Sequence, residues 1–84
     1  MFCANLNYVD EGGFFEIEIY KSEKDPIGAD IVIVADNKVH LLQKVLEKIK
    51  ENEEVYSCQD VFDAQLSEIR LQLCIAAKKC IIFS

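Results

Sequence analysis

The chain has 84 residues, of which 51% are hydrophobic and 29% are charged, and its formal net charge is −6. A chain of this length can build one small domain, and we expect a single α+β domain over residues 1–84. The acidic balance argues against an ordinary DNA- or RNA-binding module, because such modules gather Lys and Arg against phosphates. The hydrophobic fraction argues against disorder.

No secretory signal or membrane-spanning segment is visible in the sequence. The longest apolar runs, such as Ile31 to Ala35, are far shorter than the roughly 20 residues that cross a bilayer. Four cysteines, at positions 3, 58, 74 and 80, match no paired spacing. We therefore expect a cytoplasmic protein whose thiols are reduced and mostly buried.

The first third of the chain alternates apolar and polar residues, as half-buried strands do. Phe2 to Tyr8 is one such segment, Asp10 to Gly13 supplies a hairpin turn, and Phe14 to Tyr20 is the second segment. The second segment has two faces, one with Phe15, Ile17 and Ile19 and the other with Phe14, Glu16, Glu18 and Tyr20. The run from Ile31 to Val34 is β-branched throughout, which predicts a third strand covered on both faces.

The second half of the chain has the three- and four-residue spacing of amphipathic helices. Asp36 or Asn37 can cap a first helix with the apolar stripe Val39, Leu42, Val45, Leu46 and Ile49. Ser57 and Asp60 resemble a capping pair for a second helix with the stripe Phe62, Leu66, Ile69, Leu73, Ala76 or Ala77, and Cys80. Residues 69–75 also alternate with period two, so a strand is the competing interpretation, but the longer helical pattern favours a helix.

The expected element order is therefore β-β-β-α-α. It corresponds to an α+β fold, a three-stranded antiparallel sheet with two helices packed on one face. Residues Cys80 to Phe83 either continue the last helix or form a fourth strand.

The sequence contains no recognisable catalytic or metal-binding constellation. The only histidine, His40, lies off the first helical stripe, where we expect it to be exposed, and nothing in the sequence brings it to Cys58. Closely paired cysteines, the acidic spacing of a calcium loop and the glycine motifs of nucleotide sites are all missing. We expect no enzymatic activity, no metal and no cofactor.

Charge is segregated along the chain. Residues 1–36 carry eight acidic and two basic side chains, residues 37–50 carry one and four, and residues 51–68 carry six acidic side chains and no basic one. The plainer interpretation is a solvated surface that keeps a small protein soluble. The alternative is an acidic patch that attracts a basic partner, and the sequence alone does not decide between them.

The leading hypothesis is a module that binds another protein with a basic surface, without direct contact to nucleic acid or membrane. It would act as an inhibitor or regulator, for example as a phage- or plasmid-type antagonist of a nucleic-acid enzyme. The expected partner-binding residues form two acidic patches with an aromatic anchor: Asp10, Glu11, Glu16, Glu18 and Tyr20 in the hairpin, and Glu51, Glu53, Glu54, Asp60 and Asp63 around the connection between the helices.

The alternative hypothesis is structural, a homo-oligomer such as a dimer, or an accessory subunit. Leu71, Cys74 and Ile75 lie away from the stripe of the second helix, so this helix is apolar most of the way round. A helix that is apolar on two sides usually has two neighbours, and a second copy would provide the outer one.

Overall fold

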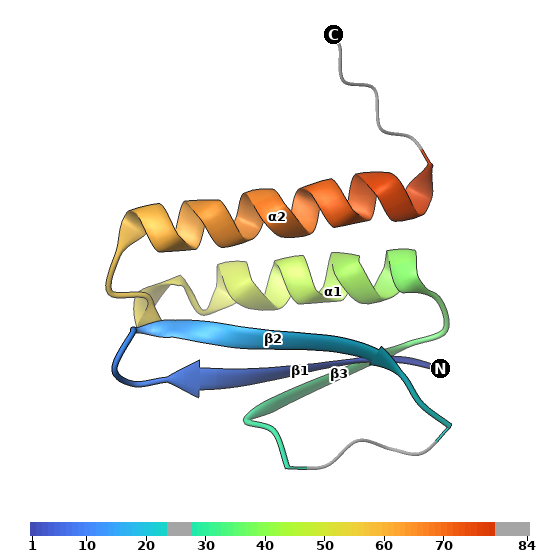
Figure 1. The fold of residues 1–84 in the computed structure, drawn as a ribbon, viewed down its shortest axis with the longest axis horizontal. Helices are drawn as coiled ribbons and strands as arrows, with labels where there is room; N and C mark the ends of the chain where they lie inside the picture. Colours follow the sequence, from blue (N-terminus) through green and yellow to red (C-terminus); the bar gives the residue numbers. More distant parts are fainter. Residues whose placement is uncertain (24–27, 79–84) are drawn as a thin grey trace, which may run out of the picture.

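Three strands precede two helices in the computed structural model, which describes residues 1–23 and 28–78 (Figure 1). The elements are β1 (Phe2–Val9), β2 (Phe14–Lys21), β3 (Ile31–Ala35), α1 (Lys38–Glu51), the 3₁₀ turn η1 (Glu53–Val55) and α2 (Gln59–Ala77). The predicted α+β fold with the order β-β-β-α-α is confirmed.

The sheet has the strand order β2-β1-β3, and both neighbouring pairs are antiparallel. Both β2 and β3 are therefore edge strands, and β1 lies between them. The prediction that the third strand is covered on both faces is wrong, because the helices cover only one face and Val32 and Val34 on the other face are partly exposed. The β-branched side chains suit the pleated surface of a strand whether or not its second face is covered.

The two faces of the sheet differ as the alternation predicts. Ala4, Leu6, Phe15 and Ile33 are buried on the face toward the helices. On the opposite face Asn7, Glu16 and Glu18 are exposed. We call this second face the open face; its side chains come from Cys3, Asn5, Asn7, Phe14, Glu16, Glu18, Tyr20, Val32 and Val34.

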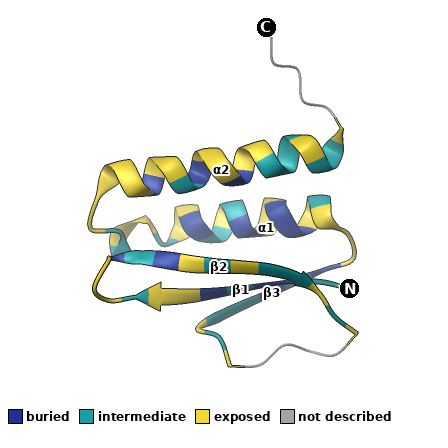
Figure 2. Cartoon of the chain, in the orientation of Figure 1, coloured by how far each residue is buried: buried dark blue, intermediate teal, exposed yellow. Residues whose placement is uncertain are grey.

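Helix α1 lies between the sheet and α2 and provides the centre of the core (Figures 1 and 2). Its N-cap is Asn37, one of the two expected caps, whose Oδ1 accepts a hydrogen bond from the backbone N–H of His40 at 2.9 Å. The fully buried side chains of α1 are Leu41, Leu42, Val45 and Ile49. Leu41 was not part of the expected stripe, which included only one of the two successive leucines.

Helix α2 runs through residues 69–75, so the helical interpretation of that segment is confirmed. It packs mainly on α1, with Phe62, Leu66 and Ile69 buried. Its outer side exposes Leu71 and Ile75, at 50% and 62% of their surface. The expected continuation over Cys80 to Phe83 lies outside the described residues.

The predicted capping pair of α2 is wrong. Its N-cap residue is Cys58, which makes no side-chain capping bond. The Ser57 hydroxyl instead donates to the carbonyl oxygen of Gly12, and the Ser57 N–H donates to the carbonyl oxygen of Gly13. Ser57 therefore ties the β-hairpin to the connection between the helices, and this tertiary contact could not be deduced from the local pattern.

The expectation of mostly buried thiols is only partly correct. Cys3 is fully buried in the sheet, Cys74 is partly buried, and Cys58 is exposed at the start of α2. Within the described ranges, no helix combines the length and the apolar character that a membrane span requires.

Candidate functional site

The open face carries two neighbouring carboxylates on β2. Glu16 and Glu18 are two residues apart in the strand, so their side chains leave the sheet on the same side. Their cross-strand partners on β1 are Asn7 and Asn5, which carry no charge. Both glutamates are exposed, and in residues 1–23 and 28–78 the only ion pair is elsewhere, between Lys48 and Glu51. The two carboxylates therefore stand in water as an uncompensated pair.

Tyr20 continues the same row of β2 beyond Glu18. Its hydroxyl donates to Oδ1 of Asn5 at 3.2 Å, which holds the ring against β1. Its cross-strand neighbour, Cys3, is completely buried, although it belongs to the open face. Tyr20 on one side and Val34 on the other flank this thiol, so the open face has a closed apolar end beside its acidic part.

The hairpin turn and the start of α2 lie at the same end of the molecule (Figure 1). The two hydrogen bonds from Ser57 to the turn hold these segments together. The exposed acids at this end come from two segments that are more than 40 residues apart in the sequence, the hairpin turn and residues 53–60. We call them the acidic end: Asp10, Glu11, Glu53, Glu54 and Asp60.

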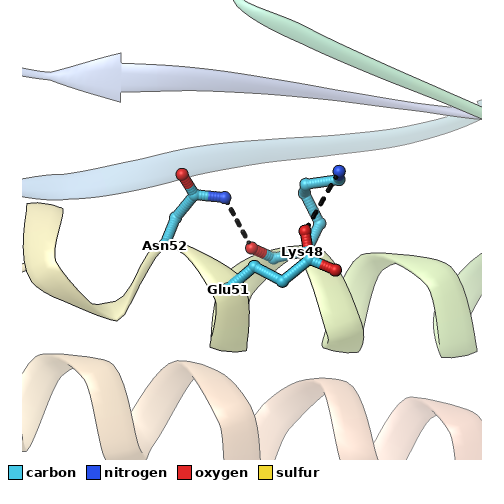
Figure 3. A network of polar contacts seen from close by, with 3 residues as sticks. All are labelled: Lys48, Glu51 and Asn52. Atoms are coloured by element: carbon cyan, nitrogen blue, oxygen red, sulfur yellow. Dashed lines mark hydrogen bonds and ion pairs between the residues drawn. The ribbon is translucent and has the colours of Figure 1, made fainter.

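Two residues of the second expected patch already have partners within the protein. Oε1 of Glu51 lies 3.3 Å from Nζ of Lys48, one turn earlier in α1 (Figure 3). Oδ1 of Asp63 accepts a hydrogen bond from Nε2 of Gln59 at 3.0 Å. The acidic patch between the helices is thus smaller than the sequence indicates, whereas the hairpin contributes all of its expected residues to exposed or partly exposed positions.

A polar contact that the sequence analysis missed connects α2 to the edge of β2. Nε2 of Gln65 donates to the carbonyl oxygen of Phe15 at 2.7 Å, and Oε1 of Gln65 accepts from the hydroxyl of Tyr56. Burial raises the pKa of the Tyr56 phenol, an effect that the backbone of Phe15 offsets in part. The signal in the sequence was the position of Gln65, a polar residue between Phe62 and Ile69 on the buried side of the helix.

The two side chains most often used in nucleophilic catalysis are far apart. His40 lies in the first turn of α1, where its ring contacts Asn37, and Cys58 lies before α2 at the other end of the molecule. The part of α1 from His40 to Glu51 separates them, a length of about 16 Å. Over the described part of the chain, no group of three or more His, Cys, Asp or Glu side chains is placed to hold a metal ion.

Comparison with protein-family models, with curated protein sequences and with solved structures finds no match to this chain.

Proposed function

We propose that this protein binds a partner protein with a basic surface, through the open face of its sheet, and thereby inhibits or regulates that partner. The observation that carries the proposal is the exposed, uncompensated pair Glu16 and Glu18 on a sheet face that no helix covers. An exposed acidic pair adds little to the stability of the fold, because charges in water interact weakly. It does attract and orient a cationic partner.

The rest of the open face has the composition of a non-obligate interface. Phe14, Tyr20, Val32 and Val34 are all partly exposed beside the glutamates. Interfaces of this kind combine aromatic and aliphatic groups in the centre with charged groups at the rim. The acidic end extends the negative potential beyond the sheet, which favours rapid association with a basic surface.

The test is a binding measurement with matched charge variants. Capture from an extract of the source organism identifies a partner, and association of the purified pair is then followed across a salt series. Glu16→Lys combined with Glu18→Lys is expected to slow association at low salt by about tenfold or more and to weaken the salt dependence.

The control for this variant is Asp36→Lys combined with Glu47→Lys, which changes the net charge by the same amount at exposed positions on the β3 side of the sheet, away from β2. The control is expected to keep most of the association rate. Equal effects of the two double variants, with thermal unfolding unchanged in both, would contradict the proposal.

A second candidate is self-association through the outer side of α2, favoured by the exposure of Leu71 and Ile75. We infer the occupant to be a second copy in the antiparallel orientation, because this brings Glu68 toward Lys78 of the other copy at both ends of the contact. Sedimentation at increasing concentration is expected to show a dimer that the combined changes Leu71→Gln and Ile75→Gln abolish. A strict monomer at high concentration contradicts this candidate.

A further inference from the structure

The edge of β2 presents a row of backbone groups that neither β1 nor β3 pairs. In an antiparallel pair, alternate residues direct both N–H and C=O toward the neighbouring strand, and the residues between them direct both groups away. The carbonyl of Phe15 is bonded by Gln65 of α2, so Phe15 belongs to the outward row. Ile17 and Ile19 are two and four residues further along β2, so their backbone N–H and C=O groups also point away from β1.

Among the described residues, only the Phe15 end of this outward row is hydrogen-bonded to a side chain, that of Gln65. In residues 1–23 and 28–78, the bond from Gln65 is the single hydrogen bond that reaches this row, and the N–H and C=O groups of Ile17 and Ile19 have no partner there. An unpaired row of this kind is a template for a further strand. A further strand could therefore pair with the outer edge of β2.

A groove lies along this open row. It has a volume of about 330 Å³ and lies between β2 and α2. The apolar part of its lining includes Ile17, Ile19 and Ile69, and Glu68 and Gln72 of α2 stand along it. Helix α1 contacts β1 and β3, whereas α2 contacts mainly α1 and lines this groove together with β2. A strand added to β2 would fill the space under α2 and bury the three isoleucines further.

The charges around the groove select its occupant. On the open face, an added strand would lie directly beside Glu16 and Glu18, and opposite charges at such cross-strand positions are favourable whereas like charges are not. Toward the helices, the alternate residues would contact Ile17 and Ile19. The complementary segment therefore alternates Lys or Arg with aliphatic residues.

A second copy of this chain fits the edge poorly. An antiparallel pairing of two β2 strands centred on Ile17 sets Glu16 against Glu18 of the other copy, twice. The other edge of the sheet, on β3, is guarded by Lys44, whose Nζ donates to the carbonyl oxygen of Val34 at 2.9 Å. The edge of β2 thus disfavours self-pairing in the register centred on Ile17, whereas the same glutamates favour a cationic segment.

We propose that β2 binds an extended segment of the partner protein as a fourth, antiparallel strand, in the groove under α2, and that this segment alternates basic and aliphatic residues. The inference rests on the proposed function and specifies its partner. Main-chain hydrogen bonds to Ile17 and Ile19 would supply affinity, and Glu16 and Glu18 would supply selectivity.

The probe is a capped hexapeptide that alternates lysine and valine, titrated into isotopically labelled protein and followed by amide chemical shifts. The valine N–H groups of an antiparallel added strand point toward β2, and the lysine N–H groups point away. An analogue methylated on the backbone nitrogens of the three valines is expected to bind at least about tenfold more weakly, because it loses main-chain hydrogen bonds to β2. The matched analogue is methylated on the backbone nitrogens of the three lysines, and it is expected to bind like the parent peptide.

Equal binding of the two methylated analogues, or no binding of the parent peptide at millimolar concentration, would overturn strand addition. The charge variants separate this failure from failure of the proposed function. If the analogues bind equally but Glu16→Lys with Glu18→Lys abolishes binding, the open face still attracts basic ligands and only the added strand is wrong. If that double variant binds the parent peptide as well as Asp36→Lys with Glu47→Lys does, the acidic pair has no role and the proposed function fails as well.

Discussion

At the scale of single residues, the contact between Gly13 and Ser57 joins the two halves of the chain. Gly13 has a φ of +63°, in the left-handed region that favours glycine. A Cβ at this position would lie 1.7 Å from Oγ of Ser57 and 3.1 Å from its backbone nitrogen. The sequence predicts the turn from its paired glycines, but the close approach of Ser57 depends on a segment more than 40 residues away.

We therefore expect Gly13→Ala to lower the free energy of unfolding by about 2 to 4 kcal/mol, through backbone strain and crowding together. Gly28→Ala is the matched control, because Gly28 also has a positive φ, +88°, but a Cβ there meets nothing within 4 Å. The control is expected to cost about 1 kcal/mol. Urea unfolding of both variants measures the difference, and equal losses would show that Ser57 does not crowd the turn.

Tyr56 provides a second prediction at this scale. Its pKa is raised above the ordinary value of 10.0 because the phenol is partly buried. The folded state therefore holds this proton more tightly than the unfolded state, so the resulting stability is present below pH 10 and is lost as the pH rises through the folded pKa.

The free energy of unfolding of the wild type, relative to that of Tyr56→Phe, is expected to be constant below pH 10 and to fall above it. The comparison removes the other groups that titrate in this range. Urea unfolding at a series of pH values provides the measurement. A difference that stays constant above pH 10 would mean that burial does not perturb this phenol.

At the scale of elements, both helices were predicted correctly from their periodicity, whereas the predicted cap was correct for α1 and wrong for α2. The spacing of Leu42, Val45 and Ile49 identified α1, and Phe62, Leu66 and Ile69 identified α2. The caps depend on which nearby side chain is free to turn back on the helix. Asn37 does so in α1, whereas the hydroxyl of Ser57 is used by the hairpin and Cys58 takes the N-cap position of α2 without a capping bond.

Helix α2 should therefore gain stability from a better cap. Cys58 has an extended N-cap conformation, with φ −134° and ψ 123°, which serine adopts readily. Cys58→Ser is expected to raise the free energy of unfolding by roughly 0.5 to 1 kcal/mol under reducing conditions. Asn37→Ala, which removes an existing cap, is expected to lower it by about 1 kcal/mol and calibrates the experiment. A loss of stability in Cys58→Ser would contradict this account of the helix start.

At the scale of the whole molecule, strand order decides where the surface is open. The alternation along β1 and β2 predicts which side chains face the helices, and this was correct for Ala4, Leu6 and Phe15. It says nothing about which strand is central, because pairing depends on contacts between distant segments. The β-branched run of β3 indicated a strand covered on both faces, whereas the helices cover only one face and Val32 and Val34 on the other are partly exposed.

The same limit applies to the candidate site. The exposure of Glu16 and Glu18 follows from their alternation with isoleucines and was predictable. The acidic end was not, because the hairpin turn and residues 53–60 meet there through the tertiary contact of Ser57. Each sheet edge also accepts a hydrogen bond from a helix side chain, Gln65 on β2 and Lys44 on β3. Both side chains come from helices that follow the sheet in the sequence, so these contacts could not be predicted either.

The central claim is that one sheet edge is left open beside an acidic pair, and amide hydrogen exchange in the isolated protein tests it most directly. The N–H groups of Glu16 and Glu18 point toward β1, so they are expected to exchange only when the sheet opens. Those of Ile17 and Ile19 point outward and are expected to exchange almost as fast as in an unstructured peptide. Strong protection of Ile17 and Ile19 would mean that the edge of β2 is already occupied, and the binding surface proposed for this protein would not exist.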